Sequence, residues 1–184
     1  GRVFEGVMEP GARKQSGTYY TPKALVRSVL DAALAGFVGG RLGVSDVDAL
    51  RRLSAGDERA VGLLDDITIL DPAAGSGAFL LGALERLTAF RMAAGRDAAP
   101  RVIVARNLYG VDLNPAAVRL CELRLWLAVI SAEADGSPDR VEPLPNLDAF
   151  VRQGDSLSDP MRLMLRHPLR SSRHAAALAA ARRA

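Results

Sequence analysis

Three aspartates, Asp71, Asp112 and Asp155, are the residues of this sequence best placed to do chemistry. Each follows a short run of apolar and β-branched residues of the kind that forms a buried strand. A carboxylate accepts hydrogen bonds from hydroxyl and ammonium groups. Because the carboxyl ends of parallel strands meet at one edge of a sheet, the three side chains are predicted to form a row along one ligand site.

A loop of small residues begins at the first of these aspartates and reads Asp-Pro-Ala-Ala-Gly-Ser-Gly at 71–77. Pro72 has no backbone donor and ends the strand, whereas Gly75 and Gly77 have no Cβ and can adopt positive φ. A ligand can therefore approach the main chain closely, and we expect a binding site in this loop. One Gly-x-Gly is a weak motif, however, and an ordinary turn between a strand and a helix can contain it.

The row of carboxylates and the glycine loop suit a ligand that carries an amine, a ribose and an adenine. S-adenosylmethionine has all three parts. A dinucleotide site instead requires a third glycine three residues after the second, and an acid about 20 residues further on. Leu80 occupies the position of that third glycine, and Asp112 lies 41 residues after Asp71. The sequence therefore favours S-adenosylmethionine over NAD.

Three short strands and the helices between them must position these groups. We expect strands at residues 67–70, 108–112 and 147–152, parallel and adjacent. The first strand is followed by a helix that ends at Gly95, and the second by a helix from Pro115 to about Ala134. Apolar residues cover most of the circumference of this second helix, so we expect it to be buried on more than one side. Residues 101–107 suit either a strand or a short helix, and the helix is preferred.

An amino-terminal segment precedes the first strand. Thr21 is predicted to cap a helix whose first residue is Pro22, and Ser45 is predicted to cap a second, shorter helix. The predicted fold class is α/β, an incomplete doubly wound, Rossmann-like fold with parallel strands and this amino-terminal helical segment. Its predicted parts are a lead-in and helical segment at 1–65, an α/β core at 66–158 and a basic helical tail at 159–184.

Composition limits the classes of protein to which the chain can belong. It has no run of about 18 apolar residues, which argues against a membrane span. The single cysteine, Cys121, cannot form an internal disulfide and is predicted to be a core residue, so a reducing cytoplasm is the expected location. The net charge is +3, but residues 1–160 alone carry −3, because residues 161–184 hold six arginines and no acid. The basic excess is therefore confined to the tail and favours a solvated helix or an interaction arm.

Four short motifs occur in order between residues 13 and 157. They read Arg-Lys-Gln-Ser-Gly-Thr-Tyr-Tyr-Thr-Pro at 13–22, Leu-Asp-Pro-Ala-Ala-Gly-Ser-Gly-Ala-Phe-Leu at 70–80, Leu-Tyr-Gly-Val-Asp-Leu-Asn-Pro at 108–115 with Leu-Trp-Leu at 125–127, and Leu-Pro-Asn-Leu-Asp at 144–148 with Gly-Asp-Ser-Leu at 154–157. In this order they resemble the adenine-N6 DNA methyltransferases of restriction-modification and phage-defence systems, including large methylase-nuclease fusions. The first motif is similar to that of the class whose target-recognition domain follows the catalytic one.

The resemblance implies a role in binding S-adenosylmethionine for each matching residue. The methionine end would be lined by Thr18, Tyr20, Thr21 and Pro22. The methionyl and backbone contacts would come from Asp71, Ala73, Gly75 and Gly77. Asp112 would accept hydrogen bonds from the ribose hydroxyls, Leu113 would cover the adenine face, and Asp155 and Ser156 would contact the adenine amine and edge. Position 74, often Cys in the family, is Ala here.

The family's catalytic Asn-Pro-Pro-Tyr, which accepts the target amine's hydrogens and stacks the flipped adenine, does not occur in these 184 residues. Asp-Pro-Ala-Ala at 71–74 and Asn-Pro-Ala-Ala at 114–117 lack both the second proline and the aromatic ring. No catalytic residue is therefore assigned, and His167 and His174 are expected to be solvent-exposed. Two interpretations stay open: part of a longer enzyme, which we prefer, or a degenerate homologue that serves as a non-catalytic cofactor-binding or scaffold module.

The resemblance also implies partners. DNA would be bound through the full-length enzyme, and a specificity or nuclease domain or subunit would accompany it. No membrane partner is expected. The strands missing from a complete doubly wound fold would leave a sheet edge and apolar surface exposed, which predicts that the chain associates through that edge.

Overall fold

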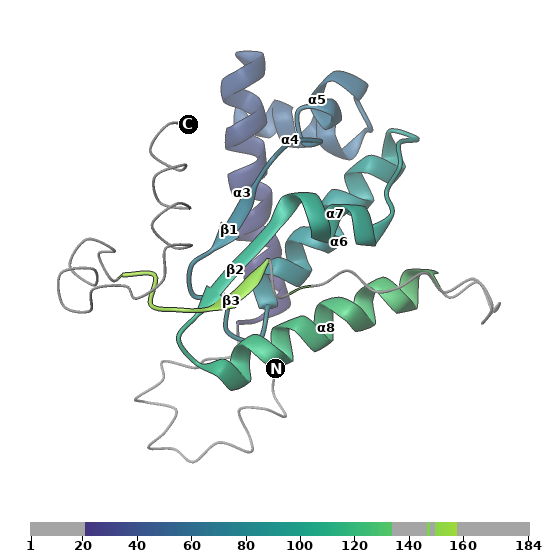
Figure 1. Ribbon diagram of the computed structural model, residues 1–184. Helices are drawn as coiled ribbons and strands as arrows, with labels where there is room; N and C mark the ends of the chain where they lie inside the picture. Colours follow the sequence, from purple (N-terminus) through teal and green to yellow (C-terminus); the bar gives the residue numbers. More distant parts are fainter. Residues whose placement is uncertain (1–20, 134–146, 148–149, 158–184) are drawn as a thin grey trace, which may run out of the picture. The chain divides into compact units, whose positions relative to one another are not determined.

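A computed structural model of the chain describes residues 21–133, 147 and 150–157, which contain a three-stranded parallel sheet (Figure 1). The strands are β1 (Ile69–Asp71), β2 (Leu108–Asp112) and β3 (Val151–Gln153), in the spatial order β1-β2-β3. Strands that are joined by short crossovers usually become neighbours, so the order follows the chain. The fold class α/β and the parallel, adjacent arrangement of the strands are thereby confirmed.

The chain divides into two units, Gly1–Gly154 and Asp155–Ala184, and the sheet belongs to the first. Within the first unit, α6 (Ala78–Ala93) packs on β1 and β2, and α8 (Pro115–Glu133) packs on β2 and β3. The two helices also contact each other, so they cover the same face of the sheet. On the opposite face Leu70 is 59% exposed, and its register partner Tyr109 is half-buried.

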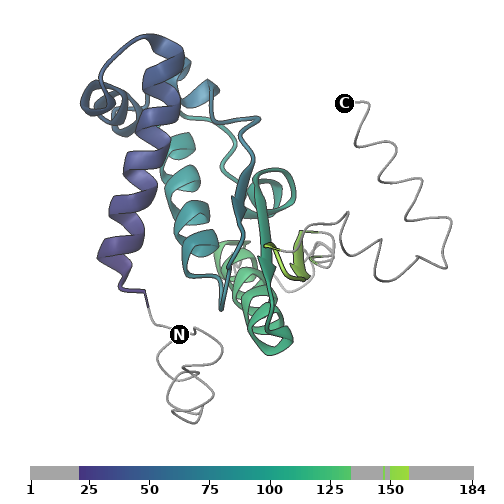
Figure 2. The ribbon, with the colours of Figure 1, turned by 90° about the vertical axis from the view of Figure 1, so that its left-hand side faces the viewer.

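Helix α3 (Lys23–Leu42) packs lengthwise against α6, as Figure 2 shows. Val26 lies beside Gly82, where an added Cβ would come within 2.5 Å of Val26 Cγ1. About one turn further along both helices, Arg86 forms an ion pair with Asp31. The two contacts advance in the same direction, so α3 and α6 run parallel and begin at the same end of the unit. The start of α3 therefore lies at the end of the sheet where the strands finish.

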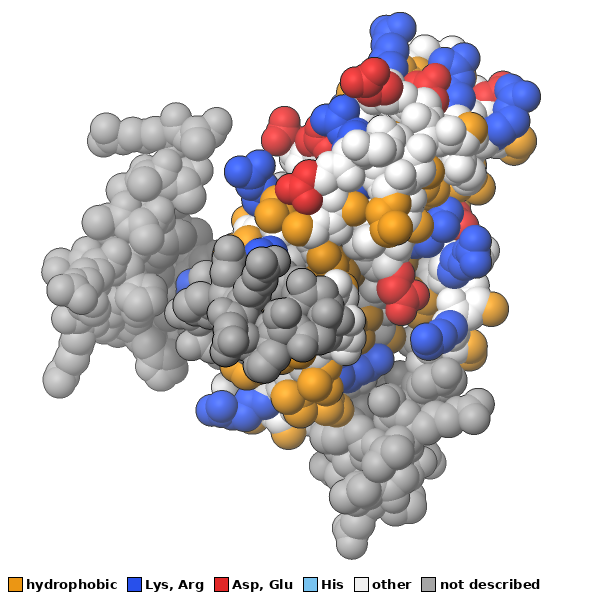
Figure 3. All heavy atoms as spheres, turned by 90° about the vertical axis from the view of Figure 1, so that its right-hand side faces the viewer, with side chains coloured by type: hydrophobic (Ala, Val, Ile, Leu, Met, Phe, Trp, Pro, Cys, Tyr) orange, Lys and Arg blue, Asp and Glu red, His pale blue; other side chains and the backbone are white. Residues whose placement is uncertain are grey.

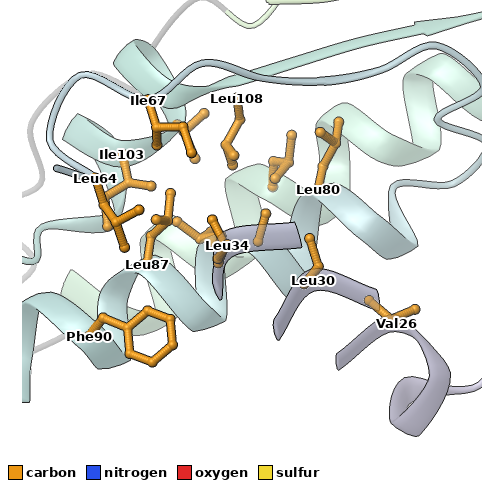
Figure 4. Packing of buried hydrophobic residues seen from close by; sticks show 14 of the residues in the cluster. Val26, Leu30, Leu34, Leu64, Ile67, Leu80, Leu87, Phe90, Ile103 and Leu108 are labelled. Atoms are coloured by element: carbon orange, nitrogen blue, oxygen red, sulfur yellow. The ribbon is translucent and has the colours of Figure 1, made fainter. Parts of the chain in front are cut away.

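The hydrophobic core lies between these helices and the sheet (Figure 4). It includes Val26, Leu30 and Leu34 of α3, Leu80, Leu87 and Phe90 of α6, and Leu108 of β2. The short helices α4 (Asp46–Ser54) and α5 (Glu58–Gly62) add the fully buried Leu53 and Val61. No helix of the described residues is long and apolar enough to cross a membrane.

A buried polar cluster holds the segment that leads into β1. Arg91 of α6 donates to Asn107 Oδ1 at 3.1 Å, and Asn107 closes α7 (Pro100–Asn107). Asn107 Nδ2 donates in turn to the carbonyl oxygens of Asp65 and Ile67, at 3.1 and 2.8 Å. Burial lowers the pKa of Arg91, and the nearby Asp65 carboxylate opposes that shift. The cluster satisfies backbone carbonyls that would otherwise be buried without a donor.

Several sequence-based boundaries differ from those in the structure. Pro22 occupies the N-cap position of α3 and no side chain caps the helix, so the predicted cap by Thr21 is wrong. The first strand begins at Ile69 rather than Ile67, and the third begins at Val151, after a turn in which Phe150 N–H donates to Leu147 O. Strand pairing sets these limits, because only residues in register with β2 form the ladder.

Other predictions are confirmed: β2 has its predicted bounds, residues 101–107 are helical, and Ser45 Oγ accepts a hydrogen bond from Asp48 N–H. One burial prediction is wrong. Leu123, Leu127 and Ile130 of α8 are 48%, 52% and 40% exposed, so one side of that helix faces outward. The reason is that α8 packs on the sheet and on neighbouring helices with one side only, and its apolar content exceeds what that contact covers.

Candidate cofactor site

The loop that follows β1 is tied to β2 by two consecutive backbone groups. Ala74 N–H donates to the carbonyl oxygen of Val111 at 2.9 Å. Gly75 N–H donates to Asp112 Oδ2 at 2.7 Å, which joins residues 37 positions apart in the chain. The acid that ends the second strand therefore lies directly against the glycine loop that follows the first. This is the contact expected if both belong to one binding site.

Helix α8 supplies a third tie to the same loop. Arg124 Nη1 donates to the carbonyl oxygen of Ser76 and also to Ser76 Oγ, the latter at 3.2 Å. The Ser76 side chain and the Arg124 side chain are both half-buried. Sequence reasoning missed Arg124, although a single cation within the apolar run 123–127 is a signal that could have marked it.

The two loop glycines have different surroundings. Gly75 has φ +53°, and among the described residues a Cβ at this position would meet only one atom, Ala73 O at 4.0 Å. Gly77 has φ +82° and precedes α6, and a Cβ there would lie 2.6 Å from Cys121 Sγ. Burial raises the pKa of the Cys121 thiol to about 12, so this buried thiol is neutral at physiological pH. Cys121 therefore shapes the loop as a packing residue, as predicted from the sequence.

Two carboxylates share this end of the sheet. Asp71 Oδ1 accepts a hydrogen bond from Ala73 N–H at 3.1 Å, and Asp112 Oδ1 accepts one from Asn114 N–H at 2.8 Å. Burial raises the pKa of Asp71, and the nearby Asp112 carboxylate raises it further, against the lowering effect of the Ala73 bond. The two neighbouring carboxylates give this end of the sheet a negative electrostatic potential, which attracts a ligand that carries positive charge.

The position predicted to cover an adenine follows Asp112 directly. Leu113 is 70% exposed, and its carbonyl oxygen accepts a hydrogen bond from Gln153 Nε2 at 3.3 Å. Asn114 then caps α8, because its Oδ1 accepts from Ala116 N–H at 2.9 Å. An exposed leucine on a fixed turn can offer an apolar surface to a flat ring.

The remaining predicted residues fall in three groups. Thr21 and Pro22 lie at the start of α3 and therefore at the same end of the unit as the glycine loop. Thr18 and Tyr20 lie outside the described residues. Asp155 and Ser156 begin the second unit, where Asp155 Oδ1 accepts a hydrogen bond from Leu157 N–H at 3.0 Å. Their contact with an adenine stays a prediction.

The residues present fit S-adenosylmethionine. No described residue fills the space beside Gly75, so the described part of the chain leaves the main chain of the loop accessible to a ligand. The carboxylates of Asp71 and Asp112 match the ammonium, sulfonium and ribose hydroxyl groups of this cofactor. In the described part of the chain, no three His, Cys, Asp or Glu side chains gather as a possible metal site.

Comparison with known proteins gives one family and two relatives. Residues 55–149 match the family described as the DNA-methyltransferase domain of MmeI. The chain is 42% identical over 103 residues to a type II restriction enzyme and methyltransferase of Methanocaldococcus jannaschii, a match that covers 51% of this chain and 9% of that protein. It is 38% identical over 96 residues to the adenine-specific methyltransferase PglX of Streptomyces coelicolor, covering 50% of this chain and 8% of that protein. The match spans less than a tenth of the length of either relative.

Proposed function

Because the chain belongs to the family of the MmeI DNA-methyltransferase domain, we propose that it binds S-adenosylmethionine for methyl transfer to adenine N6 of DNA. The observation that carries the proposal is the bond from Gly75 N–H to Asp112 Oδ2. It unites the two elements that a cofactor of this kind must contact together, the glycine loop after β1 and the acid after β2.

Each residue of the site has a distinct part in this binding. Asp71 faces the positively charged methionyl portion, and Gly75 allows that portion to approach the main chain. Asp112 accepts hydrogen bonds from the ribose hydroxyls, which its carboxylate can do beside its two backbone bonds because each oxygen has two lone pairs. Leu113 covers one face of the adenine. The sequence resemblance alone assigns Asp155 and Ser156, which begin the second unit, to the adenine amine and edge. Thr18, Tyr20, Thr21 and Pro22 close the methionine end.

The cofactor, when bound, supplies the methyl group on its sulfonium. The chain's own contribution is to hold it with fixed groups, since catalysis of such a displacement depends on positioning and on charge. Asp71 and Asp112 provide that charge, and the hydrogen bonds of the loop provide the rigidity.

Adenine as the target rests on the sequence resemblance and on PglX, a relative whose name states adenine specificity. The groups that hold and stack the adenine would be supplied by an Asn-Pro-Pro-Tyr motif, which these 184 residues lack. We therefore propose that the chain is the cofactor-binding part of a longer enzyme of a restriction-modification or related defence system, with a specificity or nuclease domain or subunit. The lack of the motif also leaves a second, less favoured candidate, a cofactor-binding or scaffold module without catalysis.

DNA is proposed to be bound through the full-length enzyme. On the face shown in Figure 3, basic and acidic side chains are interspersed with exposed apolar ones, and no continuous basic surface is formed by the described residues of that face. A protein that tracks the phosphate backbone needs such a surface. The described residues of this face therefore do not form such a surface.

The sheet also supports the proposal of a larger, doubly wound fold. Among the described residues β1 pairs only with β2, and Leu70 on its uncovered face is 59% exposed. A groove of about 480 Å³ lies between the outer side of β1 and α3, with Leu30, Phe37 and Ile69 in its lining. A further strand would fit this edge, and without one we expect the chain to associate there. Sedimentation velocity over a range of concentrations tests this, and a concentration-independent monomer would refute it.

Calorimetric titration of the chain tests the proposed function. S-adenosylmethionine should bind saturably with one site per chain, whereas NAD should not bind, because Leu80 replaces the third glycine of a dinucleotide loop. Equal binding of both ligands, or no binding of S-adenosylmethionine by folded chain, would overturn the proposal.

A further inference from the structure

The side chain of Arg124 binds the glycine loop at Ser76. It belongs to α8, on the helix face turned toward the sheet end, and its charge acts on the buried thiol of Cys121 in the preceding turn. Its Nη1 atom donates to both the carbonyl oxygen and the hydroxyl of Ser76. A guanidinium is charged at every physiological pH and holds its donors in a rigid fork, so this bond does not depend on pH in the physiological range.

The peptide between Ser76 and Gly77 is held on both of its sides. Arg124 binds its carbonyl oxygen, and its N–H, which belongs to Gly77, donates to Ala74 O at 2.8 Å. A trans peptide is planar and carries these two groups on opposite sides, so two partners fix the orientation of the plane. That plane determines the direction of the chain at the point where Gly77, with φ +82°, turns into α6.

Three consecutive loop residues are thus bound to β2 and to α8, the helix that follows it. Ala74 is bound by Val111 O and Gly75 by Asp112 Oδ2, while Ser76 is bound by Arg124. The first tie is main chain to main chain and does not depend on a side chain. The other two depend on Asp112 and Arg124, and of these only Asp112 carries a proposed role in contacting the cofactor.

We propose that Arg124 is a positioning residue for cofactor binding: it sets the Ser76–Gly77 peptide and thereby keeps the glycine loop open and ready for the ligand. The proposal rests on the proposed function, because it concerns the same site. A preset loop lowers the ordering cost of binding, so losing the tie weakens affinity although Arg124 touches no ligand atom.

Hydrogen exchange measured by mass spectrometry on the chain without ligand tests the positioning directly. In Arg124→Ala the amides of residues 75–78 should exchange about tenfold faster or more, since bonds from a charged donor are among the stronger ones. Arg124→Lys, which keeps the charge but loses the fork, should lie between this variant and the wild type. Arg119→Ala removes an exposed arginine from the same helix and should exchange like the wild type.

Titration of the same four proteins with S-adenosylmethionine completes the experiment. We expect affinity to fall on the order of tenfold in Arg124→Ala, less in Arg124→Lys and not at all in Arg119→Ala. Faster exchange throughout the unit Gly1–Gly154 would show general destabilisation and overturn the positioning role. If Arg124→Ala unfolds, Arg124→Lys takes its place in the comparison. Lost affinity with unchanged loop exchange would also overturn it, because Arg124 would then contact the ligand itself. If the wild type binds no cofactor while its loop still depends on Arg124, the proposed function fails and the control of the loop stands.

Discussion

Asp112 Oδ2 lies 2.7 Å from the backbone nitrogen of Gly75, and the other oxygen of the same carboxylate holds Asn114 N–H at 2.8 Å. One side chain therefore fixes both the loop after β1 and the turn into α8. Each carboxylate oxygen has a second lone pair, so these structural bonds are compatible with the proposed bonds to the ribose hydroxyls.

Asp112→Ala should weaken S-adenosylmethionine binding by about tenfold to a few hundredfold, because charge-assisted bonds contribute roughly 1.5 to 3 kcal/mol each. It should also lower the free energy of unfolding by about 1–3 kcal/mol, since two backbone donors lose their acceptor. Calorimetric titration and thermal melts measure the two effects.

Asp97→Ala is the matched control, because Asp97 Oδ1 also accepts a backbone N–H two residues on, from Ala99 at 2.9 Å, and no cofactor role is proposed for it. Its melting temperature should fall slightly and its affinity should stay unchanged. If Asp112→Ala behaves in the same way, with stability lost and affinity kept, Asp112 is structural only and its assignment to the ribose is wrong.

Gly77→Ala should destabilise the chain for two separable reasons. Its φ of +82° disfavours a side chain by roughly 1–2 kcal/mol, and the new Cβ would lie 2.6 Å from Cys121 Sγ, where overpacking costs about 1–3 kcal/mol more. Gly95→Ala isolates the first cost, because Gly95 has φ +64° and no described residue lies within 4 Å of its Cβ position. In chemical denaturation, the double variant Gly77→Ala/Cys121→Ala should therefore recover part of the free energy of unfolding that Gly77→Ala loses. If the changes in the free energy of unfolding of the two single variants simply add in the double variant, the predicted contact is excluded.

Asp71→Asn should raise stability near neutral pH while it weakens cofactor binding. Burial and the Asp112 charge raise the pKa of Asp71, so the folded state binds a proton more tightly than the unfolded state. The charged carboxylate therefore opposes folding above the raised pKa, and wild-type stability increases relative to the variant as pH falls through that value. Asparagine keeps an acceptor for Ala73 N–H without the charge. Thermal melts from pH 8 downward should show an advantage of the variant that shrinks with falling pH, and an advantage that grows instead would contradict the raised pKa.

The chain alone should transfer no methyl group to DNA, because the Asn-Pro-Pro-Tyr that would hold the adenine amine is absent from its sequence. Labelled S-adenosylmethionine and an adenine-rich duplex provide the assay, with an intact adenine-N6 methyltransferase as the positive control. Label in DNA above a protein-free blank would mean that other residues of this chain perform the chemistry.

The sequence predicted the elements whose signals are local. The bounds of β2 and the start of α8 at Pro115 follow from an apolar run that ends in Asp-Leu-Asn-Pro, and the structure has both. The resemblance to DNA methyltransferases of restriction-modification and defence systems is confirmed by the family match and the relatives. The order of the four motifs indicates the family because these motifs supply the residues of one site.

Features that depend on distant contacts could not be predicted. Nothing local to Arg124 indicates that its partner is Ser76, 48 residues earlier, because only the packing of α8 beside α6 brings them together. The exposed Leu123 and Leu127 were predicted to be buried because a helix's apolar content does not reveal how many neighbours it has. The start of α3 was placed one residue early because an N-cap can lack a side-chain bond, as at Pro22.

The central claim is that S-adenosylmethionine binds at the site that the glycine loop and Asp112 form together. A titration of the ¹⁵N-labelled chain with the cofactor, followed by the backbone amide resonances, tests it most directly. We predict saturable shifts at Ala73, Gly75, Gly77 and Leu113, with the amides of α4 unmoved. Saturable shifts that gather elsewhere, or a spectrum of folded chain that the cofactor leaves unchanged, would contradict the claim.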